Sequence, residues 1–147
     1  QITMQALDYL NLTHLVNREF ASLSGGQRQL ILIARAIASE CKLILLDEPT
    51  SALDLANQDI VLSLLMDLAQ SQNMTVVFTT HQPNQAVAIA NKALLLNKQN
   101  YQFGKTKDIL TSENLTALFH LPMFEQQAQY KESFFTHFVP LYKTLLK

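Results

Sequence analysis

Two adjacent glycines at the start of a predicted amphipathic helix are the first candidates for a functional site. Gly25 and Gly26 follow Ser24 and open a run of apolar residues at helical spacing that extends to about residue 39. Glycines leave backbone N–H groups unscreened at the positive end of a helix, where proteins bind phosphate and other anions. The pattern therefore indicates an anion site, to which the Ser24 hydroxyl adds a donor. The alternative is an ordinary helix cap followed by flexible glycines.

A pair of acids is the second candidate. Asp47 and Glu48 come directly after Leu43–Leu46, a short apolar run of the kind found in strands that are buried on both faces of a parallel sheet. Open α/β sheets bind ligands at the carboxyl ends of their strands. One carboxylate there can hold Mg²⁺ directly or through water, and the other can orient an attacking water. The alternative is a pair of solvated loop acids.

A histidine ends the next strand pattern. Residues 74–80 are rich in β-branched and aromatic types, and His81 follows them directly. A histidine at that place can hydrogen-bond to a terminal phosphate. A structural role is the equal alternative for a single histidine at a strand end.

Taken in order, four motifs resemble the ATPases of ABC transporters. LSGGQ occupies residues 23–27, LILLDEP residues 43–49, SALD residues 51–54 and TTH residues 79–81. They are similar to the family's signature motif, its Walker B motif with the catalytic glutamate, its D-loop and its switch histidine. The resemblance covers roughly residues 1–120 and is weaker in the tail.

The resemblance implies a role for each matched residue. The signature residues would contact the γ-phosphate of an ATP held by a partner subunit; they are Ser24, Gly25, Gly26 and Gln27. Asp47 would serve Mg²⁺, and Glu48 would act as general base for the hydrolytic water. Asp54 would reach toward the partner's phosphate loop, and His81 would hold the γ-phosphate.

One family motif has no match in the printed sequence. A Walker A loop needs the pattern G-x-x-x-x-G-K-[ST], because stacked N–H groups and a lysine must hold the phosphates. The segment 104–106 reads Gly-Lys-Thr, but Gln99 stands where the first glycine is required. We therefore predict that this segment binds no phosphate and that the chain begins partway through a domain. We also predict that the chain alone binds ATP weakly and does not hydrolyse it.

Strand and helix patterns alternate around these motifs, which predicts an α/β fold. With the resemblance, this is a partial P-loop NTPase domain with parallel buried strands flanked by helices, an edge hairpin and a small C-terminal extension. Helices are predicted over residues 1–19 (one or two short ones), 25–39, 54–71, 83–90 and 111–119, and the hairpin over residues 93–96 and 101–103. Asp54 suits the N-cap of its helix, and Pro83 suits a first turn. The tail from residue 130 fits a helix interrupted at Pro140, or a short strand over residues 134–139.

The same patterns suggest boundaries along the chain. Residues 1–120 would form the C-terminal part of an ABC ATPase domain. Within it, residues 1–39 would end the helical subdomain and include the signature helix, and residues 40–106 would run from Walker B to the hairpin. Residues 107–147 would form a helical or extended tail.

Composition limits the class of protein. The 147 residues are 48% hydrophobic and 16% charged with a net charge of −1, which predicts a globular domain and does not favour a polyanion as partner. The single cysteine, Cys41, precedes a predicted strand and is expected to be an inert apolar residue in a reducing compartment. No apolar run is long enough to cross a bilayer, and the first residues do not resemble a signal peptide.

The residues after the histidine favour one branch of the family. The string HQPN at residues 81–84 is similar to subunits that serve importers of metal chelates, vitamin B12 and molybdate, although Gln82-Pro83-Asn84 could simply begin a helix. The resemblance implies ATP and Mg²⁺ as cofactors, a homodimer, a transmembrane permease, a periplasmic or surface substrate-binding protein and no nucleic acid. It also implies a peripheral position at the cytoplasmic face of the bacterial inner membrane.

Two other interpretations remain at this point. The chain could be a non-catalytic regulatory or interaction piece, because the phosphate-holding half is missing from the sequence. It could also derive from an ABC ATPase that works on DNA or the ribosome. Such proteins usually surround the signature with coiled coil, zinc ligands or basic extensions, and the sequence shows none of these.

Overall fold

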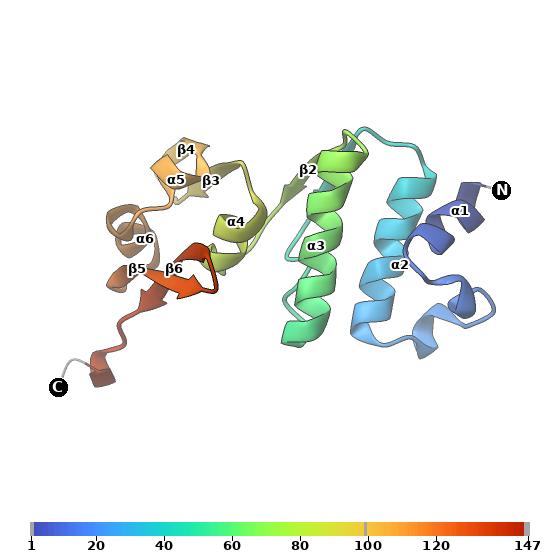
Figure 1. Cartoon of the computed structure of the whole chain (residues 1–147), viewed down its shortest axis with the longest axis horizontal. Helices are drawn as coiled ribbons and strands as arrows, with labels where there is room; N and C mark the ends of the chain where they lie inside the picture. Colours follow the sequence, from blue (N-terminus) through green and yellow to red (C-terminus); the bar gives the residue numbers. More distant parts are fainter. Residues whose placement is uncertain (1, 99, 146–147) are drawn as a thin grey trace. The chain divides into compact units, whose positions relative to one another are not determined.

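A computed structural model describes residues 2–98 and 100–145 of the chain. It divides into two compact units, Gln1–Thr80 and His81–Lys147, drawn in blue to green and in yellow to red in Figure 1. Each unit has its own hydrophobic core and is taken by itself below. Among the described residues, no helix has both the length and the apolar character needed to span a membrane.

The first unit is mainly helical. Its helices are α1 (Ile2–Tyr9), α2 (Gly25–Ala38) and α3 (Leu55–Ser71), with 3-10 turns at Thr13–Leu15 and Phe20–Ser22. The helices predicted over residues 25–39 and 54–71 are confirmed. Helix α1 packs on α2 through a cluster of small and aliphatic side chains, which comprises Ala6, Leu7, Leu12, Leu15, Leu23 and Ala34. The Tyr9 hydroxyl donates a hydrogen bond to Asp67 of α3; burial and this bond raise the pKa of Tyr9 to about 12.

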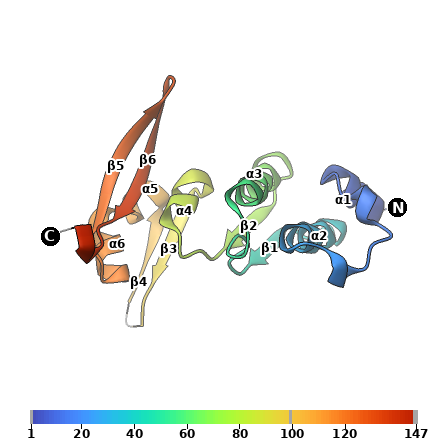
Figure 2. The same cartoon turned by 90° about the horizontal axis from the view of Figure 1, so that it is seen from below.

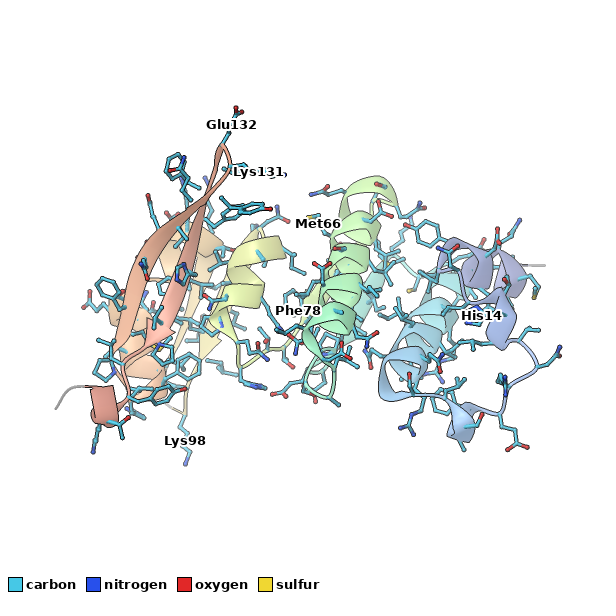
Figure 3. The ribbon with its side chains drawn as sticks, turned by 60° about the horizontal axis from the view of Figure 1, so that its bottom comes forward. His14, Met66, Phe78, Lys98, Lys131 and Glu132 are labelled. Carbon is cyan, nitrogen blue, oxygen red and sulfur yellow. The ribbon has the colours of Figure 1, made fainter. Side chains whose placement is uncertain are left out.

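The first unit also contains two parallel strands, and the predicted acids directly follow the first of them. Strands β1 (Leu43–Leu46) and β2 (Thr75–Phe78) pair in parallel, with Leu43 opposite Thr75 and Leu46 opposite Phe78. Helix α3 forms the crossover between them, as parallel pairing requires. Phe78, labelled in Figure 3, is the last residue of β2. Both strands therefore end at the same edge of the sheet.

The burial of β1 differs from the expectation of two buried faces. Ile44 is 5% exposed, but Leu43 is 52% and Leu45 is 70% exposed. Side chains alternate between the faces of a strand, so one face of β1 is covered and the other is open. The sheet has two strands in the described part of the chain, and no element of the described first unit covers the second face.

The second unit combines short helices with two hairpins. Its elements are α4 (Pro83–Ile89), β3 (Lys92–Leu96), β4 (Tyr101–Lys105), α5 (Thr106–Ile109), α6 (Ser112–Phe119), β5 (Met123–Tyr130), β6 (Ser133–Pro140) and a 3-10 turn at Lys143–Leu145. The predicted edge hairpin is confirmed as the antiparallel pair β3–β4; Gln99 lies outside the described residues. The core holds Leu110, Leu115, Met123 and Phe138.

The tail forms strands. Strand β6 pairs antiparallel with β5 from Met123 opposite Pro140 to Tyr130 opposite Ser133, and Figure 2 shows the pair as a long two-stranded ribbon. The strand interpretation of residues 134–139 is therefore right and the helical one is wrong. Pro140 explains the outcome, because proline interrupts a helix but is tolerated at the end of an edge strand.

Candidate functional site

The two predicted acids lie at the common end of β1 and β2, where the threonine directly after β2 contacts both. The Thr79 hydroxyl donates to Asp47 Oδ1 at 2.6 Å and accepts from the Glu48 N–H at 2.9 Å. We call Asp47, Glu48 and Thr79 the strand tip. All three residues are exposed. A ligand can therefore reach the carboxylates from solvent. The Thr79 hydroxyl meanwhile holds Asp47 and Glu48 in place through its two hydrogen bonds.

The backbone at Glu48 has a rare conformation. Its φ is +42°, in the left-handed region that residues other than glycine seldom adopt. Its carbonyl accepts hydrogen bonds from the Ser51 N–H at 3.2 Å and from the Ser51 hydroxyl at 3.1 Å. The N–H is bonded to Thr79, as described above. Hydrogen bonds on both sides of Glu48 thus hold the turn that presents its side chain.

A capping box begins the signature helix α2. The Gln27 N–H donates to Ser24 Oγ at 3.2 Å, and the Ser24 N–H donates to Gln27 Oε1 at 3.0 Å. The helix cap that was the alternative for this segment is therefore present. It does not remove the donors, because the first N–H groups of a helix have no intrahelical acceptor. Gly25 and Gly26 supply those first N–H groups, and Gly25 is exposed.

A second helix begins beside the first. Asp54 caps α3, as predicted: its Oδ1 accepts from the Asn57 N–H at 2.8 Å. The Asn57 amide also donates to both carboxylate oxygens of Asp54 at 3.0 Å. A Cβ placed on Gly26 would lie 3.2 Å from Asn57 Oδ1, so the two helix starts touch. Figure 1 shows α2 and α3 side by side with their first turns at the same end.

We call this pair of helix starts the helix mouth. It consists of Ser24, Gly25, Gly26, Gln27, Asp54 and Asn57. Two parallel helix N-termini at one place add their partial positive charges, which favours an anion. The Asp54 carboxylate offsets part of that positive charge. It accepts its hydrogen bonds from Asn57 of the same chain.

His81 is the first residue of the second unit and is described with that unit. It is exposed and lies just before α4, whose first residue is Pro83, the helix start expected for this segment. Asn84 has a structural task in that unit: its side chain donates to the Phe138 carbonyl at 3.1 Å and accepts from the Phe138 N–H at 2.7 Å. The phosphate role of His81 stays a prediction.

The strand tip suits Mg²⁺ that arrives with a nucleotide. Among residues 2–98 and 100–145, no group of three or more His, Cys, Asp or Glu side chains could hold a metal ion by itself. Asp47 and Glu48 supply two carboxylates. In nucleotide sites Mg²⁺ typically takes one or two carboxylates, with phosphate oxygens and water completing its shell. The donor set fits that arrangement.

The Gly-Lys-Thr segment at residues 104–106 serves packing. The Thr106 hydroxyl donates to the Ala90 carbonyl at 2.6 Å, and Thr106 is buried. A Cβ on Gly104 would lie 3.1 Å from the Ile109 side chain of α5, so a larger residue there would require that side chain to shift. Cys41 is half-buried, and its thiol donates to the Ala36 carbonyl at 3.3 Å.

Known proteins match the chain over its whole length. The sequence profile of the ABC transporter family matches residues 1–51. The chain is 91% identical over 147 residues to the molybdate import ATP-binding protein MolC of Haemophilus influenzae, which covers 100% of this chain and 58% of that protein. The chain belongs to the ABC transporter ATP-binding family.

Further similar proteins support this family assignment. The hemin import ATP-binding protein HmuV of Shewanella denitrificans is 39% identical over 117 residues, which cover 76% of this chain and 46% of HmuV. A solved metal-chelate type ABC transporter in an inward-facing conformation superposes with a TM-score of 0.97 at 91% identity, covering 99% of this chain and 58% of that one. The chain thus spans about half of the length of these ABC proteins. The resemblance drawn from the motifs and the α/β fold class are confirmed.

Two residues of the candidate site were missed by reasoning from the sequence. Thr79 stands in the TTH string, but only His81 was given a role there. Nothing local marks Thr79, because its partners lie 31 and 32 positions earlier. Asn57 could have been found, because a side chain three residues after an N-cap aspartate is the usual place for a capping partner.

Proposed function

We propose that this chain is part of an ATP-hydrolysing subunit that drives import of a molybdate-type oxyanion, cobalamin or a metal chelate through a membrane permease. The observation that carries the proposal is the strand tip, where two exposed acids are held side by side at the end of parallel strands. Support for the cargo comes from the names of the relatives, which import molybdate and hemin.

Each residue of the candidate site has a separate role in the proposed hydrolysis of ATP. The Glu48 carboxylate accepts a proton from the attacking water and orients its oxygen toward the γ-phosphorus. Asp47 holds Mg²⁺, which when bound neutralises charge on the phosphate oxygens. The N–H groups at Gly25 and Gly26, at the start of α2, face the γ-phosphate of a nucleotide bound to a second copy. His81 donates a hydrogen bond to the same phosphate.

The proposal requires partners. It also requires a phosphate-holding loop of the pattern G-x-x-x-x-G-K-[ST], which the 147 residues do not contain. The active unit is a dimer in which the helix mouth of one copy and the strand tip of the other share a nucleotide. The subunit works at the cytoplasmic face of the membrane with a permease and a substrate-binding protein.

Glu48→Gln in the full-length subunit tests the proposal. The amide keeps the shape of the side chain but cannot accept the proton, so we expect turnover to fall by about 10²- to 10⁴-fold. Binding does not need the base, so an ATP-bound dimer should persist in size-exclusion chromatography. The measurement is Mg²⁺-dependent phosphate release.

A matched control is Glu132→Gln, at the tip of the β5–β6 hairpin, where Figure 3 labels the side chain. It should retain parental turnover. Parental turnover in Glu48→Gln would remove Glu48 from the role of general base. The cargo is tested separately, by uptake of molybdate and of an iron chelate into vesicles that hold the complete transporter.

A further inference from the structure

A single hydroxyl controls the geometry of both acids at the strand tip. Thr79 Oγ1 lies 2.6 Å from Asp47 Oδ1 and 2.9 Å from the Glu48 nitrogen. We infer that Thr79 is a positioning residue for hydrolysis, which sets the metal-facing carboxylate and the general base relative to each other. The inference rests on the proposed function of the two acids.

The hydrogen-bond chemistry makes this hydroxyl directional. A hydroxyl has one proton, and the Asp47 carboxylate can only accept, so the Thr79 proton points to Asp47. A lone pair of the same oxygen then faces the Glu48 N–H. A bond from a hydroxyl to a carboxylate is charge-assisted and therefore among the stronger side-chain hydrogen bonds. Asp47 Oδ1 is occupied by this bond, so Thr79 determines how the carboxylate turns toward a metal.

The backbone at Glu48 explains why such a hold is needed. Its left-handed φ of +42° is unfavourable for a glutamate unless the surroundings fix it. Ser51 holds the carbonyl side of the residue, and Thr79 holds the N–H side. Without the hydroxyl, the peptide between Asp47 and Glu48 can rotate and carry both side chains out of register.

A purely structural role for the hydroxyl does not account for these contacts. The pairing of the strands is already extended by the Thr79 backbone, whose N–H donates to the Leu46 carbonyl at 2.9 Å. The side chain is exposed, so it fills no core. Its two hydrogen bonds go to the two acids of the site.

Three variants of the full-length subunit separate these possibilities. Thr79→Val keeps the shape and the β-branched side chain but removes the hydroxyl. Thr79→Ser keeps the hydroxyl and loses a methyl group. Thr75→Val makes the same chemical change at the first residue of β2, which is also exposed.

We expect Thr79→Val to lower kcat by about 10- to 100-fold, as is typical when a residue that orients a ligand is lost. The KM for ATP should stay within about threefold, because binding does not depend on the alignment of the base. Thr79→Ser should recover most of the kcat, and Thr75→Val should resemble the parent. Parental kcat in Thr79→Val, or an equal loss in Thr79→Ser, would overturn the inference.

A second readout does not depend on activity. Hydrogen–deuterium exchange at the Glu48 amide should be faster in Thr79→Val than in the parent and unchanged in Thr79→Ser and Thr75→Val. Equal protection in Thr79→Val and the parent would overturn the inference even if turnover fell. A parent that shows no ATPase activity would contradict the proposed function, and the exchange experiment would still decide whether the hydroxyl holds Glu48.

Discussion

The helix mouth is held by hydrogen bonds between residues close in the sequence, whereas the strand tip is held by hydrogen bonds between residues far apart in the sequence. At the helix mouth the Ser24–Gln27 and Asp54–Asn57 bonds join residues three positions apart. At the strand tip Thr79 bonds to residues 31 and 32 positions earlier. The first arrangement forms wherever each helix begins, whereas the second exists only when β1 and β2 pair in register.

This difference separates the two halves of the proposed chemistry. The helix mouth offers N–H donors to a phosphate, and its geometry depends on two helix starts and their contact at Gly26. The strand tip aligns a base and a metal ligand, and its geometry depends on the packing of α3 along β2. Damage to the core under α3 should therefore disorder the strand tip while the caps remain.

The largest effect is expected from Leu65→Ala. Leu65 is 1% exposed on the buried side of α3, and its truncation should lower the free energy of unfolding by about 2–5 kcal/mol. Urea denaturation followed by circular dichroism measures the loss. In the native state, exchange at the Glu48 amide should rise more than exchange at the Gln27 amide, because only the strand tip needs the strand pair.

Leu55→Ala is the matched control, because Leu55 is 83% exposed on the same helix. Its effect should be within about 0.5 kcal/mol. Equal losses for the two variants, or equal rises in exchange at Glu48 and Gln27, would contradict the separation of the two clusters.

The same contrast explains what could be predicted from the sequence. The cap at Asp54 and the start of α2 at Gly25 were predicted because their signals lie within four residues. The pairing of β1 with β2 followed from the strand–helix–strand order. Thr79 escaped because a hydrogen bond across 31 positions leaves no local pattern.

The sequence did not predict the exposed face of β1 or strand β5 of the tail, and the two reasons are related. The apolar run of β1 was expected to be buried on both faces, but a pattern records suitability for burial and not the presence of a cover, and Leu45 is 70% exposed. Strand β5 was not predicted because its Gln-rich segment, Met123–Tyr130, has few apolar residues in alternation and forms a strand by pairing with β6.

A smaller effect is expected from Gly26→Ala, which tests the contact between the two helix starts. The new methyl group would lie 3.2 Å from Asn57 Oδ1, and the Asn57 amide is held by Asp54 and cannot easily retreat. We expect a loss of about 1–3 kcal/mol in the free energy of unfolding, as for other overpacked sites. Gly25→Ala is the control, because its methyl group would meet the Ala52 carbonyl at an ordinary 3.7 Å.

The Asn57→Ala background completes this test. Removing the amide should make room, so Gly26→Ala should cost less there than in the parent, and the difference is the coupling energy of the pair. An equal cost of Gly26→Ala in both backgrounds would show that the helix starts do not press on each other at this point.

The smallest effect is expected at the cap of α3. Asp54→Ala removes the acceptor for the Asn57 N–H and should lower the free energy of unfolding by about 1 kcal/mol. Asp54→Asn keeps an oxygen at the same place and is an equally good cap, so its stability should stay within about 0.5 kcal/mol of the parent. If both variants lost the same stability, the charge of Asp54 rather than the cap would hold the helix start. The local character of the helix mouth, and with it the contrast to the strand tip, would then fail at Asp54.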